Sequence, residues 1–373
     1  MKCRYTNKAI KVIVSLFFAL CFSSISASAN AGTPLVQFGL FHLVIGNTLI
    51  GLLEGYLIYR FFKAENGKCV IIMILANYFS CIVGYILTLI AGQGLLDSIY
   101  SEISIYNVGT HIISSIILLI ILTIILEWPF CFYILRRKEK PVITSLRASI
   151  FVQLISYLFL FLIYFHMSDI SLITTIKRES PKLFAQNKSY SVYFISKDRH
   201  NISRIDINGL NRKRIATYPN KYFSMLYVKR SKDNRYWDLR GYYVDKSSFV
   251  DQLIIKNVSA KGNYIDPDGR LKDSKNWFVI FGNAICLYTC DITVKTGFWW
   301  HEGLNTSSSN GDEGIHIALE TPFVRWFSRD ATLLPDELIV YEINDQILLF
   351  DNKNRKLGLL VRGLSPVVVD ESK

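Results

Sequence analysis

The chain alternates between long apolar runs and short polar connections in its first half, and then changes to short segments with strand periodicity. Four apolar runs, at residues 36–59, 69–91, 109–132 and 148–167, stand out. Each is long enough to supply the ~20 helical residues that cross ~30 Å of hydrocarbon. The pattern predicts a four-span α-helical membrane bundle within residues 32–167.

Residues 1–31 have the pattern of a secretory signal peptide. Four basic residues precede an apolar run at 12–22, which is too short to span a bilayer, and small residues follow at 27–31. An uncleaved first helix is the alternative interpretation. Both interpretations place residue 32 on the extracytoplasmic side of the membrane.

Lysine and arginine are distributed unevenly among the connections between the apolar runs. The connection after the first run carries Arg60, Lys63 and Lys68, and residues 136–147 carry five more basic side chains. Residues 92–108 contain no Lys or Arg. The positive-inside rule therefore places the two basic connections in the cytoplasm. We expect a multi-pass protein of the bacterial inner membrane whose C-terminal domain is periplasmic or otherwise extracytoplasmic.

The C-terminal region, residues 182–373, has the alternation of β-strands and follows a linker at 168–181. Alternating segments at 190–196 and 201–208 form one hairpin unit, which Gly209 closes. A second unit near the C-terminus consists of segments at 337–343, 346–351 and 357–363. The pattern predicts an exported all-β domain. Further strand candidates lie at 241–244, 252–258, 277–280 and 284–294.

These two units resemble blades of β-propellers of the Tol-B or WD-like kind. In such blades a Val-Tyr-Phe-Ile-Ser strand precedes an Ile-Ser-Arg-Ile-Asp strand that ends at glycine. The segment from Arg362 to Pro366 is similar to a blade-to-blade connection. The resemblance implies a propeller of about four or five blades, with a recognition surface for a protein or glycan partner. A β-sandwich is the competing fold, because the middle of the region has no regular repeat.

The net charge of the chain and the motifs that its sequence lacks narrow the classes of function that it indicates. The net charge of +12 does not indicate nucleic-acid binding, because much of the excess lies in the signal segment and the two basic connections. The sequence has no G-x-S-x-G, P-loop or H-E-x-x-H motif, so neither a catalytic residue nor a cofactor is predicted. The first hypothesis is a membrane-anchored recognition or scaffold protein. The second is a small transporter, or a metal or haem redox protein.

Polar residues inside the first two apolar runs are functional candidates, because ionisable groups are costly in hydrocarbon. Asn47 and Glu54 are seven residues apart and share a helix face. Gly51 and Gly55 form a G-x-x-x-G pattern that admits a neighbouring helix. We expect Asn77 at a similar depth, hydrogen-bonded to Glu54. The set indicates either a contact that holds helices together or a path for an ion, a proton or a solute.

Three histidines form a second candidate group. The predicted topology places His42, His111 and His166 near the outer face of the membrane. Imidazoles at one depth are suited to bind a metal or haem, although histidine is also common at membrane interfaces. Near the inner face, Glu127 and Arg147 are expected to form an interfacial ion pair.

Two further features lie in the exported region. Cys286 and Cys290 allow a disulfide in an oxidising compartment. Residues four apart on a straight strand are ~13 Å apart, so pairing requires a chain turn at 287–289. His316 lies beside the polar loop 303–314 together with aromatic and acidic residues. This mixture indicates either a ligand- or metal-binding rim or aromatic packing beneath a loop.

Overall fold

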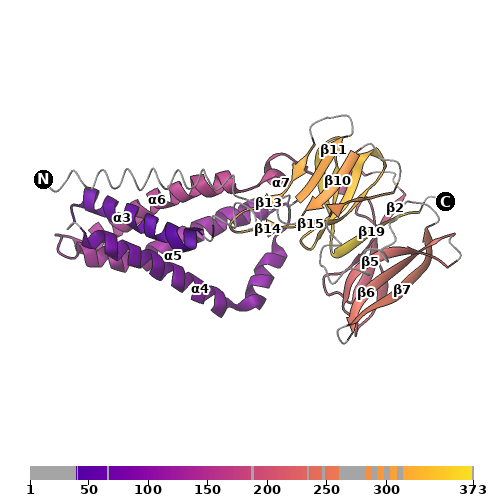
Figure 1. Cartoon of the computed structure of the whole chain (residues 1–373), viewed down its shortest axis with the longest axis horizontal. Coiled ribbons are helices and arrows are strands. Elements are labelled where there is room, and N and C mark those ends of the chain that lie inside the picture. Colours follow the sequence, from indigo (N-terminus) through magenta and orange to yellow (C-terminus); the bar gives the residue numbers. More distant parts are fainter. Residues whose placement is uncertain are drawn as a thin grey trace. The chain divides into compact units, whose positions relative to one another are not determined.

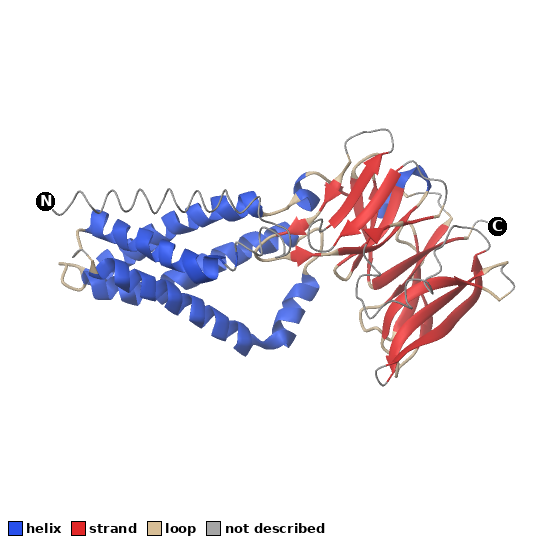
Figure 2. Ribbon diagram, in the orientation of Figure 1, coloured by secondary structure: helices blue, strands red, loops and turns tan. Residues whose placement is uncertain are grey.

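The structure is a computed structural model that describes residues 39, 41–64, 67–185, 189–232, 235–245, 248–259, 282–287, 292–297, 303–308 and 314–371. The predicted signal peptide, Cys290 and the start of the first predicted span lie outside these residues. The chain divides into two compact units. Figure 2 shows helices in the first and mainly strands in the second. The helical unit comprises Met1–Glu102, Gly109–Ser168 and Thr321–Phe323, and the β-rich unit comprises Ile103–Val108, Asp169–Glu320 and Val324–Lys373.

The helical unit contains four helices and a short π-helical turn, η2, among its described residues (Figure 1). Within the described ranges, three segments are long and apolar enough to cross a membrane: Lys68–Leu87 in α4, and the whole of α5 and α6. They coincide with the second, third and fourth predicted spans and are consistent with a membrane protein. The first predicted span corresponds to η2 and α3. The bounds are η2 His42–Gly46, α3 Asn47–Phe62, α4 Lys68–Glu102, α5 Val108–Leu135 and α6 Pro141–Met167.

Two of these helices continue beyond their predicted ends. Helix α4 runs to Glu102 and so covers much of the predicted connection 92–108, and Figure 1 shows that it bends sharply along its length. Helix α5 continues past Pro129 to Leu135. Proline usually ends or kinks a helix in water. In hydrocarbon an interrupted helix leaves backbone groups unpaired at several kcal/mol each, which favours continuation.

Helices α3 and α4 approach closely at the predicted G-x-x-x-G pattern. A Cβ atom on Gly51 would lie 2.6 Å from the Cα atom of Ile74. A Cβ atom on Gly55 would lie 2.5 Å from the Cα atom of Val70. Because real Cβ atoms do not come so close to backbone, only glycine permits this packing. The predicted close contact between neighbouring helices is confirmed.

The β-rich unit contains five sheets among its described residues, which confirms the predicted all-β domain. Their strand orders are β1-β18-β17-β16-β15-β9, β12-β11-β10-β8, β13-β14, β19-β2-β3-β4 and β5-β6-β7. Most neighbouring strands are antiparallel; β1 with β18 and β9 with β15 are parallel. The strands are β1 Lys177–Arg178, β2 Tyr190–Ile195, β3 Asn201–Asp206, β4 Lys213–Thr217, β5 Phe223–Arg230, β6 Trp237–Asp245, β7 Ser248–Ser259, β8 Gly282–Asn283, β9 Ile285–Cys286, β10 Ile292–Gly297, β11 Gly303–Ser308, β12 His316–Ile317, β13 Leu319–Glu320, β14 Arg325–Trp326, β15 Ser328–Leu333, β16 Leu338–Ile343, β17 Gln346–Asp351, β18 Lys356–Arg362 and β19 Leu364–Asp370.

The predicted hairpin units at both ends of this region are present. Strands β2 and β3 pair antiparallel, and β16, β17 and β18 form an antiparallel meander. The segment expected as a connection after Arg362 is different, because Gly363 leads directly into the buried strand β19. Strand β19 pairs with β2, so the last strand completes the first sheet. A Cβ atom on Gly363 would lie 2.5 Å from the Phe194 ring, which explains the glycine there.

The expected linker at 168–181 is folded from Asp169 onward as part of the β-rich unit. It contains a short helix, α7, at Ser171–Thr174 and the edge strand β1. A 3₁₀ turn, η3, follows at Pro181–Leu183. Because β1 pairs with β18 near the C-terminus, the segment after α6 is held by main-chain hydrogen bonds and not only by covalent connectivity.

The connection between α4 and α5 also belongs to the β-rich unit. Ile105 is fully buried there. Its N–H donates to Oε1 of Gln346 at 3.0 Å, and its carbonyl accepts a hydrogen bond from Nη1 of Arg178 at 2.9 Å. Nη2 of Arg362 donates to the carbonyl of Ile103 at 2.7 Å. These contacts fix a six-residue connection from the first half of the chain among strands from the second half.

Candidate functional site

The helical unit contains a cavity of about 230 Å³ lined by residues from all four helices and from η2. The three predicted polar residues, Asn47, Glu54 and Asn77, all line it. Glu127 and Gln153 line it as well, although neither was assigned to this group from the sequence. The described lining includes no Lys or Arg. Its other polar residues are His42, Ser80, Cys81, Thr123, Ser156 and Tyr157.

One glutamine amide bridges two carboxyl groups in this cavity. Nε2 of Gln153 donates to Oε1 of Glu54 at 3.1 Å and to Oε2 of Glu127 at 2.6 Å. The second oxygen of Glu54 accepts a hydrogen bond from Nδ2 of Asn77 at 2.7 Å, which is the expected contact between the first two spans. Asn47 lines the cavity but donates within its own helix, to the Leu43 carbonyl. The site therefore joins α3, α4, α5 and α6 through two buried acids.

Glu127 does not form the expected interfacial ion pair. Its side chain is fully buried, whereas Arg147 is exposed. Because α5 continues to Leu135, Glu127 lies about two turns before the end of its helix, as Glu54 does in α3. This depth brings the two acids to the same level of the bundle, where Glu127 contacts Ser80 and Gln153 in place of Arg147.

The helices close the cavity with apolar side chains between the carboxyl groups and the basic connections. Leu57, Ile58 and Met73 belong to a buried cluster there, with partners from α5 and α6. In the other direction the lining reaches His42, which precedes Glu54 by ~18 Å along an α-helical rise. The cavity therefore extends from the two carboxyl groups toward His42 on one side, and apolar side chains pack on the other side.

The three histidines do not form a common site. Nδ1 of His42 lies 2.6 Å from the hydroxyl of Tyr164, and His42 lines the cavity. His111 and His166 are not among its lining residues. Within the described ranges, no three His, Cys, Asp or Glu side chains are grouped to hold a metal ion. The metal or haem role remains a prediction that none of these contacts supports.

The cysteines separate as expected between the two regions. Cys286 is disulfide-bonded, and Cys290, the predicted partner, lies outside the described residues. Cys69, Cys81 and Cys131, all in helices of the helical unit, are thiols. A disulfide in the β-rich unit fits an oxidising compartment.

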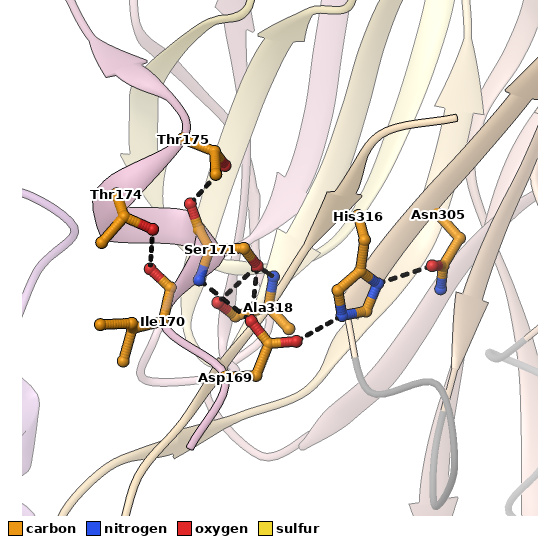
Figure 3. A network of polar contacts seen from close by, with 8 residues as sticks. All are labelled: Asp169, Ile170, Ser171, Thr174, Thr175, Asn305, His316 and Ala318. Carbon is orange, nitrogen blue, oxygen red and sulfur yellow. Dashed lines mark hydrogen bonds and ion pairs between the residues drawn. The ribbon is translucent and has the colours of Figure 1, made fainter. Parts of the chain in front are cut away.

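A second polar network lies in the β-rich unit (Figure 3). Nε2 of His316 contacts Oδ2 of Asp169 at 2.6 Å, and Nδ1 contacts Oδ1 of Asn305 at 2.6 Å. Ser171 donates its N–H and its hydroxyl to Oδ1 of Asp169, at 3.0 and 2.7 Å. Burial opposes ionisation of Asp169, but the hydrogen bonds from His316 and Ser171 outweigh it and lower its pKa to about 2.

This network holds the segment after α6 against strands β12 and β13. Asp169 also exchanges two backbone hydrogen bonds with Glu320, at 2.9 and 2.7 Å. His316 therefore supports the chain and is not shown to bind a ligand. The other members of the predicted rim, at 298–301 and 312–313, lie outside the described residues.

Asp169→Asn is expected to destabilise the protein by about 1 kcal/mol at pH 7, a figure reduced because the side chains of Asp169 and His316 are both partly exposed. A lowered carboxyl pKa contributes stability above the unfolded-state value near ~4, and this contribution is lost as the pH falls toward ~2. Thermal unfolding from pH 3 to 8 measures the difference, with the exposed Asp245→Asn as control. Equal stability of wild type and Asp169→Asn at pH 7 would show that the hydrogen bonds to the Asp169 carboxylate do not stabilise the fold.

The sequence matches no protein-family model, and comparison with curated proteins finds no match. A functional conclusion therefore depends on the geometry of the two carboxyl groups in the helical unit.

Proposed function

We propose that this protein is a proton-coupled membrane protein of the transporter class, which takes up a proton from the extracytoplasmic side at Glu54 and Glu127. The observation that carries the proposal is the amide of Gln153 bridging two buried carboxyl groups in a cavity whose described lining has no Lys or Arg. Two ionised carboxylates there would be two uncompensated charges in hydrocarbon, which is costly. At least one proton is needed to reduce that cost.

We propose that this proton lies on Glu127, from a count of the hydrogens available to its hydrogen-bond partners. Oγ of Ser80 has one hydrogen but two oxygen neighbours, the Asn77 carbonyl at 2.9 Å and Oε1 of Glu127 at 3.0 Å. If Ser80 donates to the carbonyl, the hydrogen in its contact with Glu127 belongs to the carboxyl group. Both oxygens of Glu54 face amide N–H donors, which suits an ionised carboxylate.

The same donors favour a proton over a metal cation. Amide N–H groups from Asn77 and Gln153 point at three of the four carboxyl oxygens. A metal ion would need those oxygen lone pairs directed at a common centre. A purely structural contact between helices would need only one hydrogen-bonded pair. A second buried acid adds cost without need, unless the site gains and loses a proton.

The proposed topology has four spans. The π-helical turn of 5 residues and α3 of 16 residues together approach the ~20 residues that a span requires. Ile105 is buried in the β-rich unit, so the α4–α5 connection and that domain share one side of the membrane. Two crossings, α5 and α6, return the chain to that side. The basic connections are then cytoplasmic and the β-rich domain extracytoplasmic.

Reporter fusions test this topology directly. Fusions after Gly67 and after Lys140 are expected to show cytoplasmic activity, and a fusion after Lys373 is expected to show exported activity. The expectation follows from the positive charge of the two basic connections and the burial of Ile105 among the strands. A cytoplasmic signal from the Lys373 fusion would invert the topology and remove the proposed access side.

Access from the extracytoplasmic side follows from this topology. The cavity lining extends to His42, at the end of the bundle opposite the basic connections. The apolar cluster around Ile58 and Met73 separates the carboxyl groups from the cytoplasmic connections. A proton can therefore reach the pair from outside through this cavity, while transfer to the cytoplasm requires a change in the packing of the helices.

A hydrophobic carbodiimide tests the proposed proton site, because it reacts with protonated carboxyl groups in apolar surroundings. We expect modification of Glu127, faster at pH 5 than at pH 8, in full-length protein reconstituted in lipid. Peptide mass spectrometry locates the adduct. Glu127→Gln should abolish it, and Glu139→Gln, which removes an exposed acid, should not. No adduct on Glu127 at pH 5 would contradict the proposal.

For the exported domain we propose a propeller-like arrangement. Its support is the series of antiparallel meanders and the pairing of β19 with β2, which joins the two ends of the domain as propeller closure requires. A β-sandwich remains the competing fold. Binding of a protein or glycan partner by this domain remains a prediction.

A further inference from the structure

The helical unit has a second cavity, of about 190 Å³, between the α3–α4 connection and the end of α5. Nζ of Lys138 donates to the carbonyl of Lys63 at 3.0 Å and ties the two connections together. This carbonyl belongs to the residue that ends α3, where helix carbonyls lack intrahelical partners. The basic residues that line the cavity are Lys63, Lys68, Arg136, Arg137 and Lys138.

All charged side chains in the described part of this lining are basic. Glu139 follows Lys138 in the chain but does not line the cavity, and Glu65 of the α3–α4 connection lies outside the described residues. Cations from separate segments repel one another when they converge, unless an anion compensates them. Arg136 is held in place by the ring of Tyr133, whose centroid lies 4.5 Å from the guanidinium carbon. A guanidinium fixed in this way presents a planar fork that fits a phosphate.

The N-terminal end of helix α4 adds to the positive potential of this cavity. It begins at Lys68 and has no acidic residue in its first turn. The positive end of its helix dipole is therefore uncompensated by its own side chains and adds to the field of the lysines.

Apolar side chains form the rest of the lining. Ala64, Ile72, Ile134 and Leu135 come from the helix ends and face the same cavity as the cations. Polar groups alone would be enough to bind a free phosphate ion. A phospholipid presents a phosphate next to its hydrocarbon chains, so a cavity with cations beside apolar helix ends matches a lipid better.

We infer that this cavity binds the phosphate headgroup of an anionic phospholipid of the cytoplasmic leaflet. The inference rests on the proposed membrane topology and is independent of the proton site. The lipid would bridge the α3–α4 and α5–α6 connections through Lys68 and Arg136, and it would stabilise the cytoplasmic end of the bundle.

Native mass spectrometry and thermal unfolding of the full-length protein in a neutral detergent test this inference. Added phosphatidylglycerol should bind and raise the melting temperature, whereas phosphatidylcholine should not. The double variant Lys68→Gln/Arg136→Gln should weaken phosphatidylglycerol binding about 30-fold, from the loss of two cationic contacts. The matched control Lys140→Gln/Arg147→Gln removes the same charge from exposed positions outside the cavity and should bind as wild type does.

Three results would overturn the inference. Equal weakening by the control would mean attraction by overall charge without a defined site. Equal stabilisation by inorganic phosphate at the same concentration would identify a soluble anion in place of a lipid. Equal binding of the two lipids would exclude recognition of the charged headgroup. Reporter fusions that keep the proposed topology in the double variant separate a lost lipid site from a misinserted protein.

Discussion

Gly55→Ala is expected to destabilise the helical bundle by about 2 kcal/mol, the range found when a packed interface is overfilled. The added Cβ atom would lie 2.5 Å from the Cα atom of Val70 and 3.0 Å from the carbonyl oxygen of Cys69. Both are backbone atoms, which no rotamer change can move. Helices α3 and α4 must therefore separate, and the hydrogen bond between Glu54 and Asn77 should lengthen with them. Thermal unfolding of the purified protein in detergent measures the effect.

Gly84→Ala is the matched control in α4. A Cβ atom on Gly84 meets nothing within 4 Å. Because alanine is favoured over glycine in a helix by roughly 0.5–1 kcal/mol, this variant should melt at or above the wild-type temperature. A Gly55→Ala protein as stable as Gly84→Ala would show that α3 does not pack on α4 at this point.

Substitutions of the two acids are expected to have unequal effects. In Glu127→Gln the amide oxygen can accept from Gln153 and the amide N–H can donate to Ser80, as a protonated carboxyl group does, so stability should stay close to wild type. In Glu54→Gln one amide N–H would face an N–H donor of Asn77 or Gln153. Glu54→Leu would take one acceptor from each of these amides and cost about 1–2 kcal/mol, although Asn77 keeps the Met73 carbonyl and Gln153 keeps Glu127.

The order of melting temperatures tests this asymmetry. We expect wild type and Glu127→Gln to be similar, Glu54→Gln lower and Glu54→Leu lowest. Glu127→Leu is the control that removes the polar contacts at this buried position. It takes away the acceptor for Gln153 and the partner of Ser80 together. If Glu127→Gln lost as much stability as Glu54→Gln, the proton would not be localised on Glu127.

Much of the helical unit could be predicted from the sequence, because each apolar run is a local signal. The contact between Glu54 and Asn77 followed from helix periodicity and the alternating direction of the spans. Glu127 was misplaced because it was paired with Arg147 at the inner face, and its contact with Gln153 of another helix has no local pattern in the sequence. Gln153 was missed because its span was expected to begin at residue 148, near the inner face, whereas α6 begins at Pro141 and carries this amide deeper.

The β-rich unit was predictable where neighbouring strands are also consecutive in sequence. Strands β16 to β18 form such a meander, and their alternation identified them. Contacts between distant segments have no local pattern. Asp169 and His316 are 147 residues apart, and the bond from Ile105 to Gln346 joins residues 241 apart. The start of strand β19 was taken for a blade-to-blade connection because the segment from Arg362 to Pro366 resembles one in β-propellers.

Infrared difference spectroscopy of the reconstituted protein between acid and alkaline pH tests the central claim most directly, because a carboxylic acid has a C=O band that a carboxylate lacks. The proposed proton on Glu127 predicts such a band at low pH that diminishes as the pH rises. The band should be absent in Glu127→Gln and present in Glu54→Gln. A spectrum without a buried carboxylic acid band at any pH, or a band unchanged in Glu127→Gln, would contradict a proton site at this residue.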